Sequence, residues 1–198
     1  MTTDREWDRR LRIATTGRED ESGSRNSPYE PTAYAVLERL AAGGWLGEEN
    51  HLLDYGCGKG RAVLYLAWRT GCRATGLDLS RKLIDMAEAN LSRFASAVRA
   101  NFVCCAAEAY LPEDEDAFFF FNPFSEKVLR VVLRRILTSW YARPRPMKLF
   151  FYYPTPEYLA ALYAEPELTY AGGIDCRDLF DGDEERERIV IFTLGGDV

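Results

Sequence analysis

The sequence contains few of the residues on which several common kinds of active site depend. Among its 198 residues there is one histidine, His51, and the five cysteines include no Cys-x-x-Cys pair. A catalytic triad that depends on histidine is therefore excluded, and a zinc site made of cysteines and histidines is not favoured. The odd number of cysteines suits a reducing compartment and predicts a cytoplasmic protein.

The sequence also lacks an apolar run long enough to cross a membrane, and its charged N-terminus does not resemble a secretion signal. Neither internal repeats nor low-complexity segments are present. The net charge of −6 argues against a nucleic-acid binder that works by bulk electrostatics. We therefore expect no membrane partner, and we disfavour a nucleic-acid partner without excluding it.

The first 27 residues differ in composition from the rest of the chain. They are rich in charged residues and in Gly, Ser and Thr, and they have few apolar positions. We expect residues 1–27 to form a mobile tail or a lid that orders on binding. Residues 28–198 are long enough for one α/β domain with a substantial core, and too short for two.

From residue 28 onward, short apolar runs alternate with helical patterns, which predicts a parallel sheet. Strands are expected near 51–55, 73–77, 101–105, 117–121 and 147–153. Helices are expected near 61–69, 81–95, 125–141 and 156–164, after a first helix that carries Tyr34 and Leu40. The last two strands, near 168–174 and 188–194, are joined by an acidic, turn-rich stretch and are therefore expected to be antiparallel.

Residues 52–60, Leu-Leu-Asp-Tyr-Gly-Cys-Gly-Lys-Gly, are the most informative stretch. They predict a buried strand that ends in a glycine-rich turn, where missing Cβ atoms let the backbone adopt positive φ and lie against a ligand. The helix that follows points its free amides at the same place. A dinucleotide fingerprint needs glycine where Arg61 stands, and a phosphate-binding Walker loop needs Ser or Thr directly after Lys59.

The pattern Asp54-x-Gly-x-Gly-x-Gly after a strand instead resembles the first motif of the class I S-adenosylmethionine (SAM) methyltransferases. Asp54 supports this interpretation, because a carboxylate repels a pyrophosphate but suits an amino-acid ammonium. Asp78 ends a second predicted strand about twenty residues further on, where this topology places an acceptor for ribose hydroxyls. The resemblance covers roughly residues 28–194. It implies a Rossmann-like α/β fold with a doubly wound, seven-stranded, mostly parallel sheet and an antiparallel last strand.

The resemblance also implies a set of contacts with SAM. Asp54 and the glycine loop would hold the methionine end, and Asp78 would hold the ribose. The position that usually accepts a hydrogen bond from the adenine amino group holds Ala106, so Glu108 or a backbone carbonyl would take that role. The residues expected to bind the cofactor are Asp54, Tyr55, Gly56, Cys57, Gly58, Gly60, Asp78, Leu79, Ala107, Glu108 and Asn122.

The candidate catalytic residues are Asn122, Pro123 and Phe124, which follow the apolar run 117–121 and so lie at the carboxyl end of a central strand. They resemble the Asp/Asn-Pro-Pro-Tyr/Phe motif of methyltransferases that act on planar nitrogens. In that motif the amide oxygen and a proline carbonyl bind the target amine, and the ring stacks on the substrate. Here only one proline is present. The alternative is a strand-ending turn in which Ser125 caps the next helix and Phe124 packs in the core.

A basic segment, residues 127–148, contains seven cationic side chains and no acid. Its cationic residues are Lys127, Arg130, Arg134, Arg135, Arg143, Arg145 and Lys148. One interpretation is a docking stripe for nucleic acid or an acidic partner. We favour the other interpretation, which is a solvated helix face balanced by the acidic stretch 175–187.

Methyl transfer from a sulfonium needs alignment, exclusion of water and stabilisation of a cation, and no covalent intermediate. The sequence therefore predicts a SAM-dependent methyltransferase that acts on a small-molecule or protein acceptor, with nitrogen as one candidate atom. The alternatives are a nucleic-acid methyltransferase for adenine or cytosine amino groups, a non-catalytic SAM- or nucleotide-binding protein, and a dinucleotide-binding oxidoreductase. Glu30, Glu108 and several tyrosines stay open as a general base, and neither the acceptor nor the oligomeric state is indicated.

Overall fold

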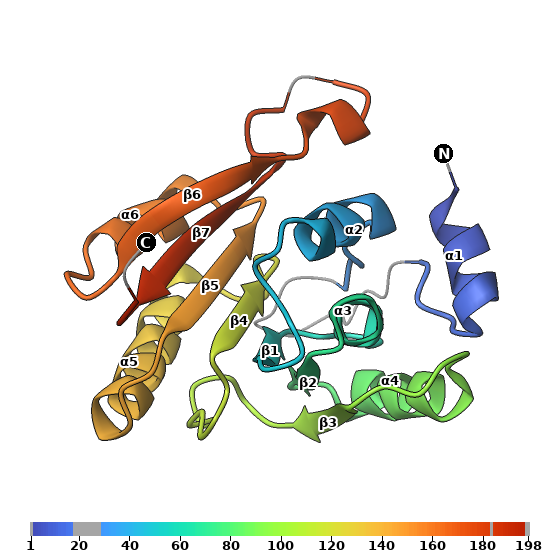
Figure 1. The fold of residues 1–198 in the computed structure, drawn as a ribbon, viewed down its shortest axis with the longest axis horizontal. Coiled ribbons are helices and arrows are strands. Elements are labelled where there is room, and N and C mark those ends of the chain that lie inside the picture. Colours follow the sequence, from blue (N-terminus) through green and yellow to red (C-terminus); the bar gives the residue numbers. More distant parts are fainter. Residues whose placement is uncertain (1, 18–28, 183, 197–198) are drawn as a thin grey trace.

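A computed structural model describes residues 2–17, 29–182 and 184–196 (Figure 1). Its centre is a seven-stranded sheet in the order β3-β2-β1-β4-β5-β7-β6. The strands are β1 (His51–Tyr55), β2 (Arg73–Asp78), β3 (Ala100–Cys104), β4 (Ala117–Phe120), β5 (Met147–Tyr152), β6 (Thr169–Asp175) and β7 (Arg188–Leu194). Strand β7 is antiparallel to both β5 and β6, whereas the other neighbouring strands are parallel. The predicted Rossmann-like sheet is confirmed.

The helices connect the strands and cover both faces of the sheet. They are α1 (Asp4–Leu11), α2 (Tyr34–Ala42), α3 (Arg61–Thr70), α4 (Arg81–Arg93), α5 (Glu126–Ala142) and α6 (Pro156–Tyr163), with a short 3-10 helix at Arg177–Leu179. The expected strands and helices from residue 28 onward all occur, with ends that agree to within two residues. Helix α1 was not expected from the sequence. Among the described residues, no helix is both long and apolar enough to cross a membrane.

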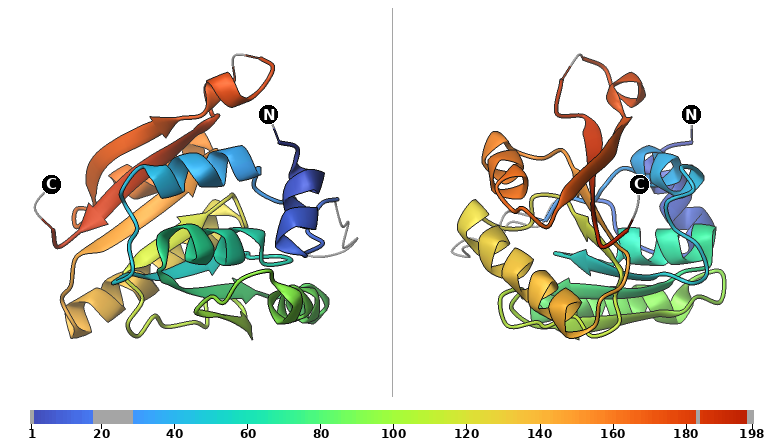
Figure 2. Two further views of the ribbon diagram at one scale, coloured as in Figure 1. Left: turned by 45° about the vertical axis from the view of Figure 1, so that its right-hand side comes forward. Right: turned by 60° about the vertical axis from the view of Figure 1, so that its left-hand side comes forward.

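Two hydrophobic cores lie on the two faces of the sheet. Helices α2 and α3 pack on one face, where they contact Phe119 and Phe150. Helices α5 and α6 pack on the other face, against Phe118 and Phe120. Figure 2 shows the sheet between these two layers. Because successive side chains of a strand point to opposite faces, the unbroken apolar run in β4 supplies both cores at once.

Residues 2–17, for which the sequence predicts a mobile tail or a lid, fold onto the domain. Helix α1 begins with a capping box, in which Thr3 and Glu6 satisfy each other's backbone amides. Its Trp7 ring packs edge-to-face on Tyr65 of α3, with ring centroids 5.5 Å apart. Residues 18–27 lie outside the described residues, so the domain boundary at residue 27 stays a prediction.

Candidate active site

The glycine loop connects the carboxyl end of β1 to the first residue of α3. Gly56 and Gly58 have φ of +77° and +53°, a region that L side chains rarely adopt. A Cβ on Gly56 would lie 2.4 Å from Pro123, and a Cβ on Gly58 would lie 2.2 Å from the Tyr29 ring. Both positions therefore require glycine for backbone conformation and for close approach.

Two carboxylates flank this loop. Asp54 is only 4% exposed, and burial, reinforced by the charge of Asp78, raises the pKa of Asp54 to about 8. Within the described parts of the chain, no basic side chain forms an ion pair with Asp54. Asp78 accepts hydrogen bonds from the backbone amides of Gly58, at 3.0 Å, and Ser80, at 2.9 Å. A cationic ligand against the loop would therefore favour the charged form of Asp54.

A pocket opens above the carboxyl ends of β1 and β4. Its lining includes Asp54 and Gly56, the rings of Phe119 and Phe121, and residues 29–32. The pocket combines aromatic rings with charged and polar side chains, and it lies where open α/β sheets bind their ligands.

The Asn122-Pro123-Phe124 segment follows β4 after one residue, Phe121. Asn122 has a left-handed backbone, with φ of +42°, and its amide nitrogen Nδ2 donates a 2.7 Å hydrogen bond to the Tyr153 carbonyl. Pro123 packs against Gly56, as described above. The Phe124 ring meets Tyr55 and Phe120 edge-to-face, at centroid distances of 6.2 and 6.3 Å. Pro123 thus borders the glycine loop, Asn122 contacts the end of β5, and Phe124 packs on the core.

Residues 52–142 match a protein-family model described as a methyltransferase domain. Over these residues the chain carries a SAM-dependent methyltransferase domain. The match spans β1 to α5 and so includes the glycine loop, Asp78 and the Asn122 segment. Among curated proteins, none matches the chain.

Solved structures with the same fold include methyltransferases with different acceptors in their names. Magnesium protoporphyrin IX methyltransferase from Synechocystis PCC 6803, with bound SAM, is 16% identical with a TM-score of 0.58, covering 81% of this chain and 76% of its own. An RNA methyltransferase from Salinibacter ruber, bound to S-adenosyl-L-homocysteine (SAH), is 17% identical with a TM-score of 0.60, covering 85% and 96%. A TehB-like SAM-dependent methyltransferase from Corynebacterium glutamicum is 20% identical with a TM-score of 0.57, covering 82% and 88%. At these identities the likeness concerns the fold alone.

The methyltransferase's own residues fit its cofactor. The glycine loop has the positive-φ backbone expected of the motif, and a positively charged ligand would offset the cost of charging the buried Asp54. Asp78 is held in place by two backbone amides at the edge of the same loop. The predicted use of SAM is therefore supported by the site as well as by the family.

The residues expected near the adenine lie on two adjacent strands. Leu79 follows β2 and is 55% exposed, and Ala107 and Glu108 are half-buried in the turn after β3. The Cys105 amide donates to the Asp78 carbonyl at 3.0 Å, which keeps the ends of these strands side by side. The backbone carbonyl of Glu108 already accepts a hydrogen bond from Arg135. The adenine contact thus stays a prediction, with the Glu108 carboxylate and nearby carbonyls as candidates.

The expected loop contacts Tyr55, Cys57 and Gly60 lie in three different surroundings. The Tyr55 side chain is 1% exposed and stacks on Phe120 in the core beneath α5, so it does not line the pocket. A cofactor contact of Tyr55 would have to come from its backbone. Cys57 is buried and lines the pocket, whereas Gly60 begins helix α3 as its N-cap residue.

The sequence did not indicate that Arg61 contacts the N-terminal segment, or that residues 29–32 line the pocket. In the sequence, Arg61 indicates only that the loop is not a dinucleotide fingerprint, and among residues 29–32 only Glu30 stands out, as one candidate general base. The signal for Arg61 lay in the paired acids Asp4 and Asp8 of the charge-rich N-terminus, which nothing in the sequence connects to the glycine loop.

A second group of polar side chains lies at the opposite, amino-terminal edge of the sheet. His51, Asp114 and Glu115 offer metal-ligand atoms within 4.8 Å of one another. However, both ring nitrogens of His51 are engaged, Nδ1 with Asp114 at 3.0 Å and Nε2 with the Thr75 hydroxyl at 2.8 Å. These contacts connect the starts of β1, β2 and β4, which is a structural role.

Proposed function

We propose that this methyltransferase transfers the methyl group of SAM to a small-molecule acceptor, which lies at the carboxyl ends of β4 and β5 beside Asn122. The supporting observation is that most cationic side chains of the basic segment 127–148 contact other groups of the same chain. The nucleic-acid alternative needs these cations to face a phosphate backbone. Most of them are instead engaged within the chain.

Four of the seven cationic side chains of this segment bind backbone carbonyls of the same chain. Arg135 donates to the Glu108 carbonyl at 3.0 Å, and Lys148 donates to the Trp45 carbonyl at 2.7 Å. Arg145 donates to the Glu115 carbonyl at 2.7 Å. Arg143 binds the Glu113 carbonyl and Arg130 pairs with Glu126. With these contacts made and a net charge of −6, an acceptor that enters a pocket is favoured over a polyanion that lies across the surface.

Next to Phe121, which lines the pocket, the ends of β4 and β5 carry two non-glycine residues in left-handed conformations. Asn122 has φ of +42° and Tyr153 has φ of +54°, and they follow the neighbouring strands β4 and β5. Arg186 holds Tyr153, with its guanidinium 4.1 Å from the ring centroid and Nη2 donating to the Tyr153 carbonyl at 3.2 Å. Strained backbone that persists because surrounding contacts enforce it is concentrated at functional sites.

The protein's part in the reaction is to bind, align and exclude water. When bound, SAM supplies an activated methyl carbon. Asp54 would neutralise the ammonium of its methionine end, and Asp78 would hold its ribose. Asn122 and the aromatic side chains Phe121 and Tyr153 would orient the acceptor nucleophile, which supplies rate by proximity and alignment.

The test is to follow methyl label from radioactive SAM into a cell extract separated into metabolites, RNA and protein. Label in the metabolite fraction is expected, and it should fall sharply with Asn122→Ala. SAH binding, measured by calorimetry, serves as the control that each protein sample is folded. Label in RNA or protein and not in metabolites, from protein that binds SAH, would contradict the proposed acceptor class.

A further inference from the structure

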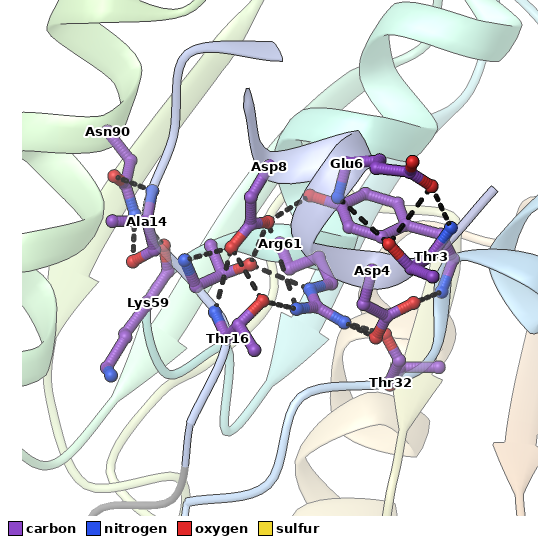
Figure 3. A network of polar contacts seen from close by, with 12 residues as sticks. Thr3, Asp4, Glu6, Asp8, Ala14, Thr16, Thr32, Lys59, Arg61 and Asn90 are labelled. Atoms are coloured by element: carbon purple, nitrogen blue, oxygen red, sulfur yellow. Dashed lines mark hydrogen bonds and ion pairs between the residues drawn. The ribbon is translucent and has the colours of Figure 1, made fainter. Parts of the chain in front are cut away.

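The N-terminal segment, residues 2–17, reaches the glycine loop through a buried arginine. Arg61 is the first residue of α3, directly after Gly60, and it is only 2% exposed. Its guanidinium contacts come from residues 4–34 (Figure 3). They are an ion pair with Asp4, hydrogen bonds to Thr15 Oγ1 (2.7 Å), Thr16 Oγ1 (3.1 Å) and the Thr32 carbonyl (3.1 Å), and stacking on the Tyr34 ring (4.4 Å).

Asp8 of α1 supplies the second buried charge of this network. Its carboxylate accepts hydrogen bonds from the Thr15 amide at 2.8 Å, the Thr15 hydroxyl at 2.7 Å and the Tyr34 hydroxyl at 2.7 Å. Although burial alone would raise the pKa of Asp8, the hydrogen bonds from Thr15 and Tyr34 bring it below its ordinary value. Asp8 lies 3.8 Å from Arg61. The charge of the buried guanidinium is thus balanced by carboxylates from α1.

A second anchor joins the same segment to the loop from the side of α4. Asn90 is fully buried, and its Oδ1 accepts from the Ala14 amide at 3.0 Å. Its Nδ2 donates to the carbonyl of Lys59 at 2.9 Å. Because Lys59 and Arg61 stand on either side of Gly60, the N-terminal segment is held at both flanks of the last loop glycine (Figure 3).

This anchored segment in turn holds Tyr29. The Tyr29 hydroxyl donates to the Thr15 carbonyl at 2.6 Å. The ring lies on Gly58, with two of its carbons 2.2 and 2.3 Å from where a Cβ would stand. The Lys59 ammonium lies 4.8 Å from the ring centroid. Tyr29 lines the pocket together with Asp54 and Gly56, on which the methionine end of the cofactor is expected.

We propose that Tyr29 is a cofactor-contacting wall of this methyltransferase and that Arg61 is the positioning residue that keeps it there. Arg61 holds residues 4–16 against the glycine loop, and Thr15 holds the Tyr29 ring over Gly58. The N-terminal segment is then part of the cofactor site, and the affinity for SAM and SAH depends on it. This inference rests on cofactor binding alone and is independent of the acceptor class.

The experiment measures the dissociation constant of SAH by calorimetry for the full chain and its variants. Tyr29→Ala is expected to weaken SAH binding by about tenfold, as expected for the loss of one aromatic contact. Tyr29→Phe keeps the ring but loses the hydrogen bond to Thr15, so its affinity should fall between those of Tyr29→Ala and the unaltered protein. Unchanged or tighter binding by Tyr29→Ala would overturn the proposal, because the ring would then be irrelevant or obstructive.

Arg61→Lys tests the positioning role, since a lysine keeps the charge but cannot reproduce the planar set of donors. It should weaken SAH binding about as much as Tyr29→Ala. The matched control is Arg69→Lys, which changes an arginine of the same helix that pairs with Glu38 and lies away from the loop. Arg69→Lys should lower the unfolding temperature and leave the SAH dissociation constant unchanged.

The double variant Tyr29→Ala/Arg61→Lys separates positioning from general destabilisation. If Arg61 acts through Tyr29, the double variant should bind SAH no more weakly than Tyr29→Ala alone. Effects that multiply would show that the two residues act independently and would overturn the positioning role. If Arg61→Lys fails to fold, the same comparison is made with Asp4→Asn, which removes the partner of Arg61 at the start of α1.

Discussion

The two halves of the site are built in different ways. In the cofactor half, at the ends of β1 and β2, the essential groups come from short continuous stretches, residues 54–60 and 78–80. In the acceptor half, at the ends of β4 and β5, Asn122 and Tyr153 are held in left-handed conformations by contacts with each other and with Arg186. The groups that would bind SAM directly thus form a local motif, on which Tyr29 and the N-terminal segment pack, whereas the main groups of the acceptor half are themselves set by contacts between distant segments.

This difference indicates where substrate specificity is to be sought. Structures with this fold bear the names of different acceptors, although SAM or SAH is bound in them. A motif within one short stretch stays intact as long as that stretch is unchanged. Contacts between distant segments change when any one of those segments changes, so the acceptor half can vary while the cofactor motif stays the same. Variants in the two halves should therefore separate cofactor binding from methyl transfer.

The largest expected effect is in the cofactor half, with Asp78→Ala. This change removes the acceptor of the Gly58 and Ser80 amides and the expected partner of the ribose. Loss of two charge-assisted bonds from Asp78 to the ribose hydroxyls, at about 1.5 kcal/mol or more each, should raise the dissociation constant of SAH by at least about 100-fold. Calorimetry measures it, with Asp85→Ala as the control, because Asp85 is an exposed partner of Arg81 on α4. An Asp78→Ala protein that binds SAH normally would contradict the assignment.

In the acceptor half, Asn122→Ala should spare the cofactor and impair transfer. The Tyr153 carbonyl would lose its 2.7 Å donor, and the candidate contact to the acceptor would be lost. A cost of about 2 kcal/mol in the transition state corresponds to about 30-fold in the methyl-transfer rate. The rate is measured on the labelled metabolite, and SAH binding should stay within about twofold of normal. Equal losses in binding and transfer would place Asn122 in the cofactor half.

The pH dependence of cofactor binding tests whether Asp54 must be charged to bind the cofactor. Its pKa is raised from 3.8 to about 8, so the folded, ligand-free protein binds more protons than the unfolded chain between these values. Its stability should therefore fall as the pH rises from about 4 to about 8. Because a cationic ligand favours the charged carboxylate, the affinity for SAH should rise up to about tenfold per pH unit below about pH 8 and then level off.

Calorimetry in buffers with different ionisation enthalpies checks this directly, since binding should release a proton from Asp54 near neutral pH. The Asp54→Asn variant should bind more weakly and lose this component of proton release. If Asp54→Asn releases the same number of protons as the unaltered protein, another group is responsible and the raised pKa of Asp54 is not linked to binding.

The smallest expected effect is on stability in the acceptor half. Arg186→Gln removes the stacking on Tyr153 and the hydrogen bonds to the Tyr153 and Pro154 carbonyls. We expect a loss of about 1 kcal/mol, or about 2–4 °C in the unfolding temperature, without a change in SAH affinity. Arg188→Gln is the control, because Arg188 is an exposed neighbour in the same segment. If Arg186→Gln changed the affinity for SAH, the acceptor half would also contribute to cofactor binding, which would contradict the separation of the two halves.

Much of the fold and of the cofactor loop could be predicted from the sequence because their signals are local. The apolar run of β4 indicates a strand covered on both faces, and the pattern from Asp54 to Gly60 indicates a ligand loop. The same local reasoning was less informative at Phe124 and Tyr55. Both are aromatic residues beside a motif, and only packing shows that Phe124 meets the core edge-to-face and that Tyr55 lies beneath α5.

The sequence by itself determined the class of fold and the cofactor, since strand periodicity and glycine spacing are properties of neighbouring residues. Only the tertiary structure decided the role of the N-terminal segment. Asp4 and Asp8 look like ordinary surface acids of a charge-rich tail, and Arg61 looks like the first residue of a helix. Folding buries the guanidinium, and a buried charge is stable only where partners balance it. Those partners stand more than fifty residues away in the chain, so no local pattern could reveal them.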